Sequence, residues 1–313
     1  MAAALALSER GRGRTAPNPN VGCVLVKGGR VVGRGWTQAG GRPHAEAMAL
    51  AQAGDAARGA TAYVTLEPCA HASPRGPACA DLLVDAGVAE VAIALGDPDP
   101  RTDGKGAARL RAAGITVREG IADAAARQAM AGFLTRHALG RPLVTLKLAT
   151  SLDGRIALES GESRWITGSE SRAHAHVERA RHEAILVGRG TWDADSPALD
   201  VRLPGLEDRA PRRLILTSSS LDGVETIASP AAITGLKGAD HLLVEGGAET
   251  AASFLRAGLV DRLLLYRAPI LIGSGKPALG DIGLTSLADA HGRWRLTDSR
   301  QLGSDRLEVY AHS

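Results

Sequence analysis

Apolar and polar residues follow two different periods along the first half of the chain. Short apolar segments bounded by Gly, Pro, Asn or Asp predict strands, and apolar residues spaced three or four apart predict helices. Lys27-Gly28-Gly29-Arg30 separates two strand patterns and predicts a hairpin. The predicted strands are Val21–Val26, Val31–Gly35, Thr61–Leu66 and Val88–Leu95, and the predicted helices are Met1–Arg14, His44–Ala53, Cys79–Ala86, Gly106–Ala113 and Asp123–Leu139.

A second series of strand and helix patterns follows Gly140-Arg141-Pro142, where Gly and Pro end the preceding helix. We therefore predict two domains, residues 1–141 and 142–313, both of the α/β class. In the second domain we predict strands over Leu143–Leu148, Ala184–Gly188, Arg213–Thr217, His241–Val244 and Arg262–Ala268, helices over Ser169–Ala180 and Ala248–Ala257, and paired strands within Trp294–Tyr310.

The bulk composition fits a folded two-domain protein and argues against several classes. The chain has 313 residues, of which 44% are hydrophobic and 23% charged. No apolar run approaches the ~18 residues of a membrane span. Three cysteines are too few, and odd in number, for a secreted disulfide framework, so we expect a reducing cytoplasm. A net charge of +3 and 3% aromatic residues do not predict nucleic-acid binding, although a slight positive excess suits a phosphorylated small molecule.

A candidate metal site is spread over three predicted elements. His44 and Glu46 open a helix, Cys69 follows a strand, and Cys79 opens the next helix. One imidazole and two thiolates are typical ligands of a catalytic zinc, which keeps a fourth position for water. Helix N-termini favour the thiolate form that a metal needs. The alternative in which His71 replaces Cys79 ranks lower, because His71 is only two residues from Cys69 and would strain a tetrahedral site.

The same motif indicates a reaction. In zinc deaminases the pattern H-x-E…P-C-x-x-C supplies the ligands, and the glutamate outside the coordination shell moves protons. This chain departs from it in having nine residues between its two motif cysteines. Glu46 would take a proton from a zinc-activated water and deliver it to the ring nitrogen and the departing ammonia of a hydrolytic deamination. A nucleobase or tRNA deaminase with an unrelated partner domain, and a non-enzymatic zinc protein, are the alternatives.

The second half carries weaker chemical signals. Glu245 to Thr250 combine a strand end, a glycine pair and a helix start, which allows close approach of a phosphate to a helix N-terminus. A plain tight turn is the alternative. Gly273-Ser274-Gly275-Lys276 is not a P-loop, because the first glycine of that motif is missing and Pro277 replaces Ser or Thr. These residues alone indicate an α/β domain and suggest phosphate binding.

Six short strings, spread over both halves of the chain, are distinctive in combination. The strings are Pro17–Val24 (PNPNVGCV), Pro43–Glu46 (PHAE), Thr65–His71 (TLEPCAH), Lys147–Arg155 (KLATSLDGR), Ser163–Thr167 (SRWIT) and Val244–Gly247 (VEGG). Together they resemble those of the bifunctional riboflavin-biosynthesis deaminase/reductase family. They occur in the family's order and extend over nearly the whole chain.

This resemblance implies two sequential reactions. The N-terminal domain would have a three-layer, cytidine-deaminase-like fold and would use Zn²⁺ to deaminate 2,5-diamino-6-(5-phosphoribosylamino)pyrimidin-4-one. The C-terminal domain would resemble dihydrofolate reductase and would use NADPH to reduce the ribosyl group of the resulting uracil to a ribityl phosphate. The resemblance also implies a homo-oligomer, a dimer or a tetramer, without nucleic-acid or membrane partners.

The resemblance further assigns roles to residues at matching positions. Lys147 would polarise or protonate the ring-opened sugar imine, with an ordinary exposed lysine as the equal alternative. Residues along the nicotinamide cofactor would be Ala149, Trp165, Thr167, Thr191 and Asp195, with Gly247, Ala248, Glu249, Thr250, Ala251, Ala252 and Ser253 around its phosphates. Residues that hold substrate would be Asn20, His71 and Asp97 in the first domain, and Ser163, Arg179, Leu199, Arg202 and Glu245 in the second. A rigid turn is the alternative for Asn18 and Asn20, which flank Pro19.

Three departures from the family's pattern qualify these assignments. Asp99 stands where the family usually has Asn, and Ser196 stands where it commonly has a second Asp. The stretch Ser218–Asp240 is short, as if a strand–helix unit were lost, and would border the adenosine end of the cofactor. This motivates an alternative in which only the deaminase is active and the C-terminal domain is a degenerate binding or dimerisation module. NADPH affinity, and the preference over NADH, depend on that stretch.

Overall fold

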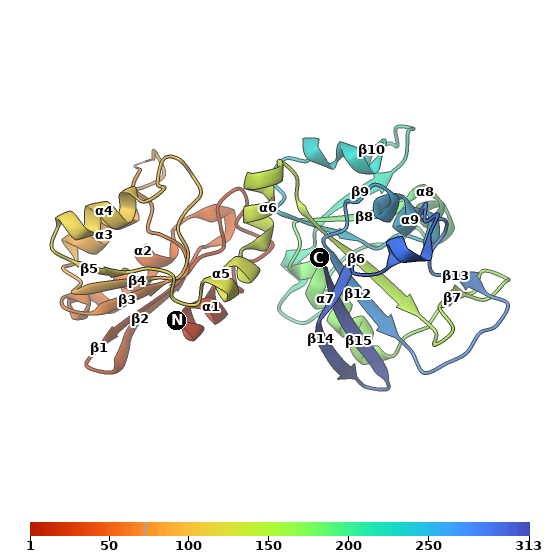
Figure 1. Cartoon of the computed structure of the whole chain (residues 1–313), viewed down its shortest axis with the longest axis horizontal. Helices are drawn as coiled ribbons and strands as arrows, with labels where there is room; N and C mark the ends of the chain where they lie inside the picture. The colour runs from red at the N-terminus through yellow and green to blue at the C-terminus, as the bar shows by residue number, and fades with distance from the viewer. Residues whose placement is uncertain (72) are drawn as a thin grey trace. The chain divides into compact units, whose positions relative to one another are not determined.

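The computed structural model describes residues 1–71 and 73–313, and the chain divides into two compact units, Met1–Gly140 and Arg141–Ser313 (Figure 1). The division falls at Gly140, which ends a helix in the left-handed conformation (φ 67°) that glycine adopts without strain. Within the described residues, no helix is both long and apolar enough to cross a membrane.

The first unit is built on a sheet of order β2-β1-β3-β4-β5 within the described residues. β1 pairs antiparallel with β2 and β3, whereas β3, β4 and β5 run parallel. Its strands are β1 (Gly22–Lys27), β2 (Arg30–Trp36), β3 (Thr61–Val64), β4 (Glu90–Ile93) and β5 (Thr116–Arg118). Its helices are α1 (Ala2–Ser8), α2 (Ala45–Ala53), α3 (Cys79–Asp85), α4 (Lys105–Ala112), α5 (Asp123–Ala129) and α6 (Ala131–Leu139), with 3₁₀ turns η1 (Ala39–Gly41) and η2 (Gly54–Ala57).

Helix α2 lies directly on β2 because two glycines leave room for its backbone. A Cβ atom at Gly33 would lie 2.2 Å from the Ala49 carbonyl oxygen, and one at Gly35 would lie 2.1 Å from that of Ala45. Ala45 and Ala49 are fully buried in this contact. Helices α3 and α4 follow on the same face of the sheet, since right-handed crossovers place them there. The contact fixes the first turn of α2, which carries Glu46.

The second unit is built on a sheet of order β10-β9-β8-β11-β6-β12-β15-β14 within the described residues. Neighbours from β10 to β12 run parallel, and β15 and β14 add an antiparallel hairpin. The strands of this sheet are β6 (Leu143–Thr150), β8 (Ala184–Gly188), β9 (Arg212–Leu216), β10 (Glu225–Ile227), β11 (His241–Val244), β12 (Arg262–Arg267), β14 (Trp294–Leu302) and β15 (Asp305–His312). A separate two-stranded sheet pairs β7 (Arg155–Ala157) with β13 (Lys276–Pro277). The helices of the unit are α7 (Ser169–Ala180), α8 (Arg189–Asp195) and α9 (Ala248–Arg256), with 3₁₀ turns η3 (Glu207–Arg209), η4 (Pro230–Gly235) and η5 (Leu287–Ala290).

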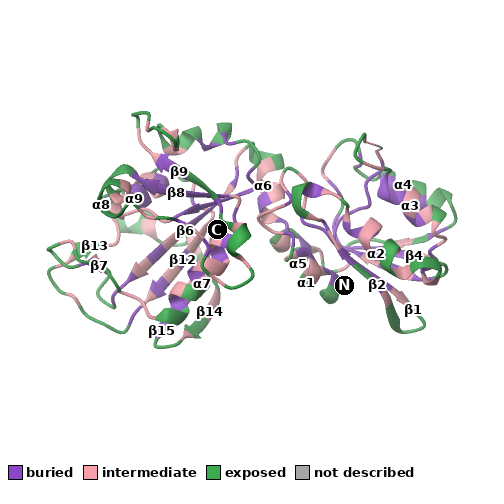
Figure 2. Cartoon of the chain, turned by 180° about the vertical axis from the view of Figure 1, so that it is seen from behind, coloured by how far each residue is buried: buried purple, intermediate pink, exposed green. Residues whose placement is uncertain are grey.

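Two parallel strands of the second unit, β8 and β11, are buried on both faces, as their continuous apolar runs predict (Figure 2). Leu242 and Val244 pack in one cluster with Phe254 of α9. Leu243, between them, points to the other face and packs with Val187 in a second cluster. The period of two along β11 therefore divides its side chains between two cores.

The structure differs from the predicted elements where local pattern is weak. The predicted helix Met1–Arg14 ends at Ser8, because Gly11 and Gly13 follow and Gly13 has a φ of 80°. The predicted helix Asp123–Leu139 is two helices that meet at Met130, whose φ/ψ of −108°/18° is not helical. The stretch Ser218–Asp240 retains the short strand β10 and the turn η4. The elements that the pattern analysis did not predict are β5, β7, β10, β13 and α8.

We predict that Gly35→Ala destabilises the first unit, since the new methyl group would meet the backbone of α2. Overpacking of this kind costs about 1–3 kcal/mol. Urea unfolding followed by circular dichroism measures the change. Gly96→Ala is the control, because a Cβ atom at Gly96 meets nothing within 4 Å. Equal unfolding midpoints for the two variants would contradict the proposed role of this close contact.

Candidate active sites

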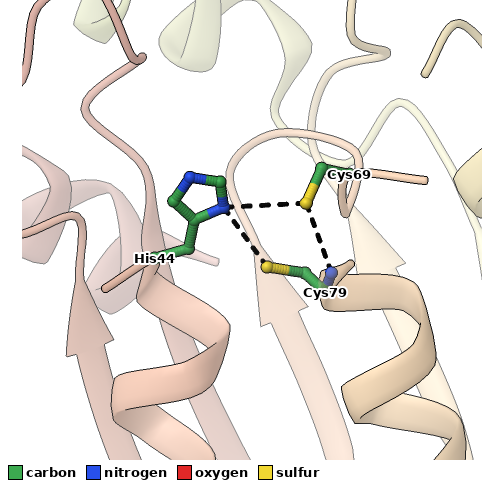
Figure 3. Close-up of side chains that lie close together, drawn as sticks. All are labelled: His44, Cys69 and Cys79. Carbon is green, nitrogen blue, oxygen red and sulfur yellow. Dashed lines mark hydrogen bonds between the residues drawn. The ribbon is translucent and has the colours of Figure 1, made fainter. Parts of the chain in front are cut away.

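The first unit brings His44, Cys69 and Cys79 together from three separate elements (Figure 3). His44 is the residue that precedes α2, Cys69 follows β3, and Cys79 begins α3. Their ligand atoms all lie within 4.8 Å of one another. Nδ1 of His44 is 3.4 Å from Sγ of Cys79 and 3.7 Å from Sγ of Cys69.

These distances suit a tetrahedral zinc ion. Zn–S and Zn–N bonds of about 2.3 and 2.0 Å place such atoms roughly 3.5 Å apart. Within the described chain, His44, Cys69 and Cys79 form the one cluster that could hold a metal, and His71 is not part of it. The Nδ1 atom of His71 lies instead 3.4 Å from the Thr102 hydroxyl. The set of three ligands leaves a fourth position open, as catalytic zinc requires.

The two thiols are electrostatically unequal. A hydrogen bond from Cys79 and the nearby His44 lower the pKa of Cys69, even though burial opposes this. The same bond, together with burial, raises the pKa of Cys79 well above its usual value. The backbone N–H of Cys79, at the start of α3, donates to Sγ of Cys69 at 3.2 Å. Cys69 is therefore the sulfur that is prepared to be a thiolate, and metal binding would take the proton from Cys79.

Glu46 is placed beside these ligands as a proton carrier. It lies in the first turn of α2 and is only 3% exposed. Burial raises its pKa to about 7, although His44 has the opposite effect. A carboxyl group with a pKa near neutrality can both accept and donate a proton in one catalytic cycle.

The two asparagines that flank Pro19 have different surroundings. Asn20 was expected to contact substrate, but it is buried away from the cavity, and its amide donates to the carbonyl oxygens of Ser8 and Ala129. Asn18 lines the cavity instead, with Nδ2 3.0 Å from Nε2 of His44. Its amide also donates to the Gly41 carbonyl oxygen at 3.1 Å, which holds the imidazole with Nδ1 toward the sulfurs.

A cavity of about 270 Å³ opens beside the metal ligands and Glu46. His71 and Asp97, both predicted substrate residues, line it. Burial raises the pKa of Asp97 to about 6, while the Arg101 side chain lowers that of Asp99 to about 2. Side chains of the cavity wall that sequence analysis did not single out are Arg42, Glu67, Ser73, Arg75, Arg101 and Phe133.

A second candidate site lies at the carboxyl ends of β6 and β11. Glu245, directly after β11, is buried and accepts two hydrogen bonds from the Arg179 guanidinium, at 2.8 and 2.9 Å. Nζ of Lys147 is 3.9 Å from the same carboxylate and 5.9 Å from the ring centre of Tyr266. Burial by itself would raise the pKa of Glu245, but Lys147 and Arg179 lower it to about 2. Of the predicted catalytic and substrate residues, Lys147, Arg179 and Glu245 thus form one charged cluster.

A small cavity of about 70 Å³ adjoins this cluster. Of the predicted residues, Lys147, Thr167, Arg179 and Arg202 line it. The remaining wall is Ser171, Arg172, Ala175, His176 and Tyr266, none of which the motifs indicated. Trp165 is 65% exposed, with the Arg172 guanidinium 4.7 Å above its ring. Asp195 lies 3.5 Å from the Arg164 guanidinium, which brings α8 to the loop that carries Trp165 and Ser163.

Close packing requires glycine at one position of the pair that follows β11. A Cβ atom at Gly246 would lie 2.4 Å from Cβ of Thr250, whereas one at Gly247 would make an ordinary contact of 3.4 Å with the Thr191 hydroxyl. Gly247 caps α9, so Gly247 and Ala248 present the N-terminus of that helix beside Thr191. This arrangement fits the phosphates of a dinucleotide, which bind where backbone N–H groups point outward.

Several predicted ligand residues have side chains that face the interior. Leu199 is 4% exposed and packs with Ile185 and Val187, so it can contact substrate only through its backbone. Ala251 and Ala252, within α9, are fully buried. If the cofactor phosphates bind at this helix, we expect its first residues and not these two side chains to contact them.

Each of the two units matches the model of a known protein family. Residues 1–95 match the model described as the cytidine and deoxycytidylate deaminase zinc-binding region. Residues 142–227 and 224–307 match the model described as the RibD C-terminal domain. The α/β fold class is confirmed, with a deaminase-like first unit and a second unit that matches the RibD C-terminal domain.

The chain is also similar to full-length proteins. It is 40% identical to the riboflavin biosynthesis protein RibD of Escherichia coli, over 97% of this chain and 96% of that protein. The RibD structure of Acinetobacter baumannii has a TM-score of 0.89 at 38% identity, covering 100% of this chain and 97% of that one. A Thermotoga maritima diaminohydroxyphosphoribosylaminopyrimidine deaminase/5-amino-6-(5-phosphoribosylamino)uracil reductase has a TM-score of 0.89 at 31% identity with the same coverage.

We predict that Glu245 makes the stability of the second unit sensitive to acid. Its pKa is about 2 in the folded protein against an ordinary 4.5, so unfolding takes up a proton below pH 4.5. The stabilisation is complete above pH 4.5 and is lost as the pH falls toward 2, by about 3 kcal/mol in all. Glu245→Gln should remove this part of the pH dependence, measured by urea unfolding with tryptophan fluorescence. Glu225→Gln, on the surface of the same unit, should retain it; an unchanged slope in Glu245→Gln would contradict the assignment.

Proposed function

The chain belongs to the RibD family of bifunctional riboflavin-biosynthesis enzymes, and from that premise we propose which of its residues carry each reaction. The protein is a zinc-dependent deaminase of 2,5-diamino-6-(5-phosphoribosylamino)pyrimidin-4-one. It is also an NADPH-dependent reductase of 5-amino-6-(5-phosphoribosylamino)uracil. The observation that carries the proposal is the His44, Cys69 and Cys79 cluster, which opens with Glu46 into one cavity.

In the deaminase, His44, Cys69 and Cys79 would hold the zinc, which would make a water molecule acidic near neutral pH. Glu46 accepts one proton of the attacking water and delivers it to the ring nitrogen. It then carries the proton of the newly added hydroxyl group to the amino group, which leaves as ammonia. The pKa of Glu46 near 7 supports both transfers. Asn18 and Asp97 are positioned in the cavity wall to orient the pyrimidine. His71, in the same wall, is within reach of the substrate's polar groups.

In the reductase, NADPH supplies the hydride when it is bound. Lys147 polarises the ring-opened sugar imine and delivers a proton to it. Its contact with Glu245 supports this role, because it holds the side chain in the wall of the cavity. Arg179 and Arg202 are suited to the substrate phosphate, because guanidinium groups match phosphate geometry. The cofactor would extend from Ala149, Trp165 and Thr167 past Thr191 and Asp195 to Gly247 and Ala248, at the start of α9.

The alternatives have less support. A degenerate C-terminal module is not favoured, since the RibD C-terminal model matches almost the whole second unit. A closed structural zinc site would need a fourth protein ligand, and the described residues offer three. The small-molecule substrate class follows from the family, whereas a homo-oligomer remains a proposal. A reducing cytoplasm is our proposal for location, because all three cysteines are unpaired and two are needed as ligands.

The proposed function is tested by mixing the purified protein with NADPH and the diaminopyrimidine ribotide and then measuring ammonia release and NADPH absorbance. Ammonia release followed by NADPH oxidation is expected. Ammonia without NADPH oxidation would instead favour the degenerate second domain. Absence of both, with zinc bound, would refute the proposal.

Two substitutions should separate the reactions. Glu46→Gln should retain zinc but lower ammonia release by about 10²–10⁴-fold, the usual contribution of a general acid–base. The same variant should oxidise NADPH normally when it receives the aminouracil. Lys147→Met should show the opposite pattern, with normal ammonia release and slow NADPH oxidation. Each variant thus serves as the folding control for the other, and deamination at the wild-type rate by Glu46→Gln would disprove its role.

A further inference from the structure

A buried carboxylate beside the metal-binding loop has no part in the chemistry described above. Glu67 precedes Pro68-Cys69 and is only 4% exposed. Its Oε2 accepts hydrogen bonds from the backbone N–H groups of Asp97 at 3.3 Å and Gly104 at 3.0 Å. Its Oε1 accepts one from the N–H of Ala107 at 3.0 Å. Buried carboxylates are costly unless hydrogen-bonded, and main-chain donors satisfy both oxygens here.

Two of these donors belong to the start of α4. Gly104 precedes this helix and has no side chain to cap it, and the first turn contains no acidic residue of its own. The free N–H groups at a helix start need acceptors and favour negative charge. Glu67, which is 37 residues away from Gly104 in the sequence, supplies both the acceptor oxygens and the negative charge. Gly106 permits this, because a Cβ atom there would lie 2.0 Å from the Pro68 carbonyl oxygen.

The third donor, Asp97, is at the opposite end of the loop that joins β4 to α4. This loop, Asp97–Gly104, forms one wall of the deaminase cavity through Asp97, Asp99 and Arg101. Asp97 and Gly104, its two ends, are therefore both held by one oxygen atom of Glu67. Thr102, inside the loop, adds a contact of 3.4 Å between its hydroxyl and His71.

We propose that Glu67 is a positioning residue of the deaminase: its carboxylate closes the substrate-binding loop Asp97–Gly104 and holds it against the segment that carries Cys69. Glu67 borders the cavity, but both of its carboxylate oxygens accept from backbone N–H groups, so it acts through Asp97 and its neighbours. Its role is to pre-form the wall that receives the pyrimidine, while the metal ligands are held by other contacts. This inference rests on the deaminase function proposed above.

The test compares Glu67→Gln with wild type for ammonia release, zinc content and NADPH oxidation with the aminouracil. Glutamine has the same shape, but its NH₂ group would face a backbone N–H donor. Removing one charged hydrogen-bond acceptor corresponds to about a tenfold change. We expect KM for the diaminopyrimidine ribotide to rise about tenfold or more, with smaller change in kcat. Zinc content and reductase rate should equal those of wild type.

Glu119→Gln is the matched control, because it removes an exposed carboxylate that pairs with Arg111 of the same helix α4. It should have the KM of wild type, since surface ion pairs contribute little.

An unchanged KM in Glu67→Gln would overturn the inference, and so would loss of zinc as the main effect. If Glu67→Gln does not fold, Glu67→Asp takes its place, because it keeps the charge but is too short to reach all three donors. A raised KM then supports the inference and an unchanged KM overturns it. A wild-type protein that releases no ammonia would refute the proposed function itself.

Discussion

The close contact between α2 and β2 is the constraint on which the deaminase half depends. Gly33 and Gly35 let the helix backbone lie against the strand at distances that no other residue would allow. This contact sets the position of His44, which precedes the helix, and of Glu46 in its first turn. The two sulfurs come from the other side of the site, where β3 ends and α3 begins. The three ligands come from separate backbone segments, so the geometry of the metal site depends on how these segments pack.

Each of the two sites contains a buried glutamate, but the pKa of that glutamate is raised in one site and lowered in the other. Both Glu46 and Glu245 are buried carboxyl groups, and burial raises the pKa of each. Glu46 has few positive charges nearby, so burial dominates and its pKa reaches about 7. Glu245 lies between Lys147 and Arg179, which reverse the effect and lower its pKa to about 2. The first group can therefore exchange protons, whereas the second remains a fixed negative charge that holds cations.

Both sites also lie where parallel strands end, which is where α/β sheets leave a crevice for ligands. In the first unit the segments after β3 and β4 carry Cys69 and Asp97. In the second unit the carboxyl half of β6 carries Lys147, and Glu245 directly follows β11. Loops at these ends must be held in place, because they have no sheet partners of their own. Glu67 in the first unit and the Arg179–Glu245 pair in the second do so with buried charge.

The sequence by itself determined the elements with strong periodicity and the chemistry of short motifs. Ser169–Ala180, Ala184–Gly188 and His241–Val244 were predicted with the bounds that the structure has. The two strands among them are short, mainly apolar runs that are buried throughout. The zinc ligands were evident because their residue types suit one metal.

Tertiary structure alone decided which side chains face a cavity. Asn18 and Asn20 share a motif, yet only Asn18 lines the cavity. Leu199 proved to be a core residue, and Glu67 gained its role from donors some 30 to 40 residues away. The local sequence determines the chemistry that a side chain can perform, whereas long-range packing determines which groups it contacts in the folded protein.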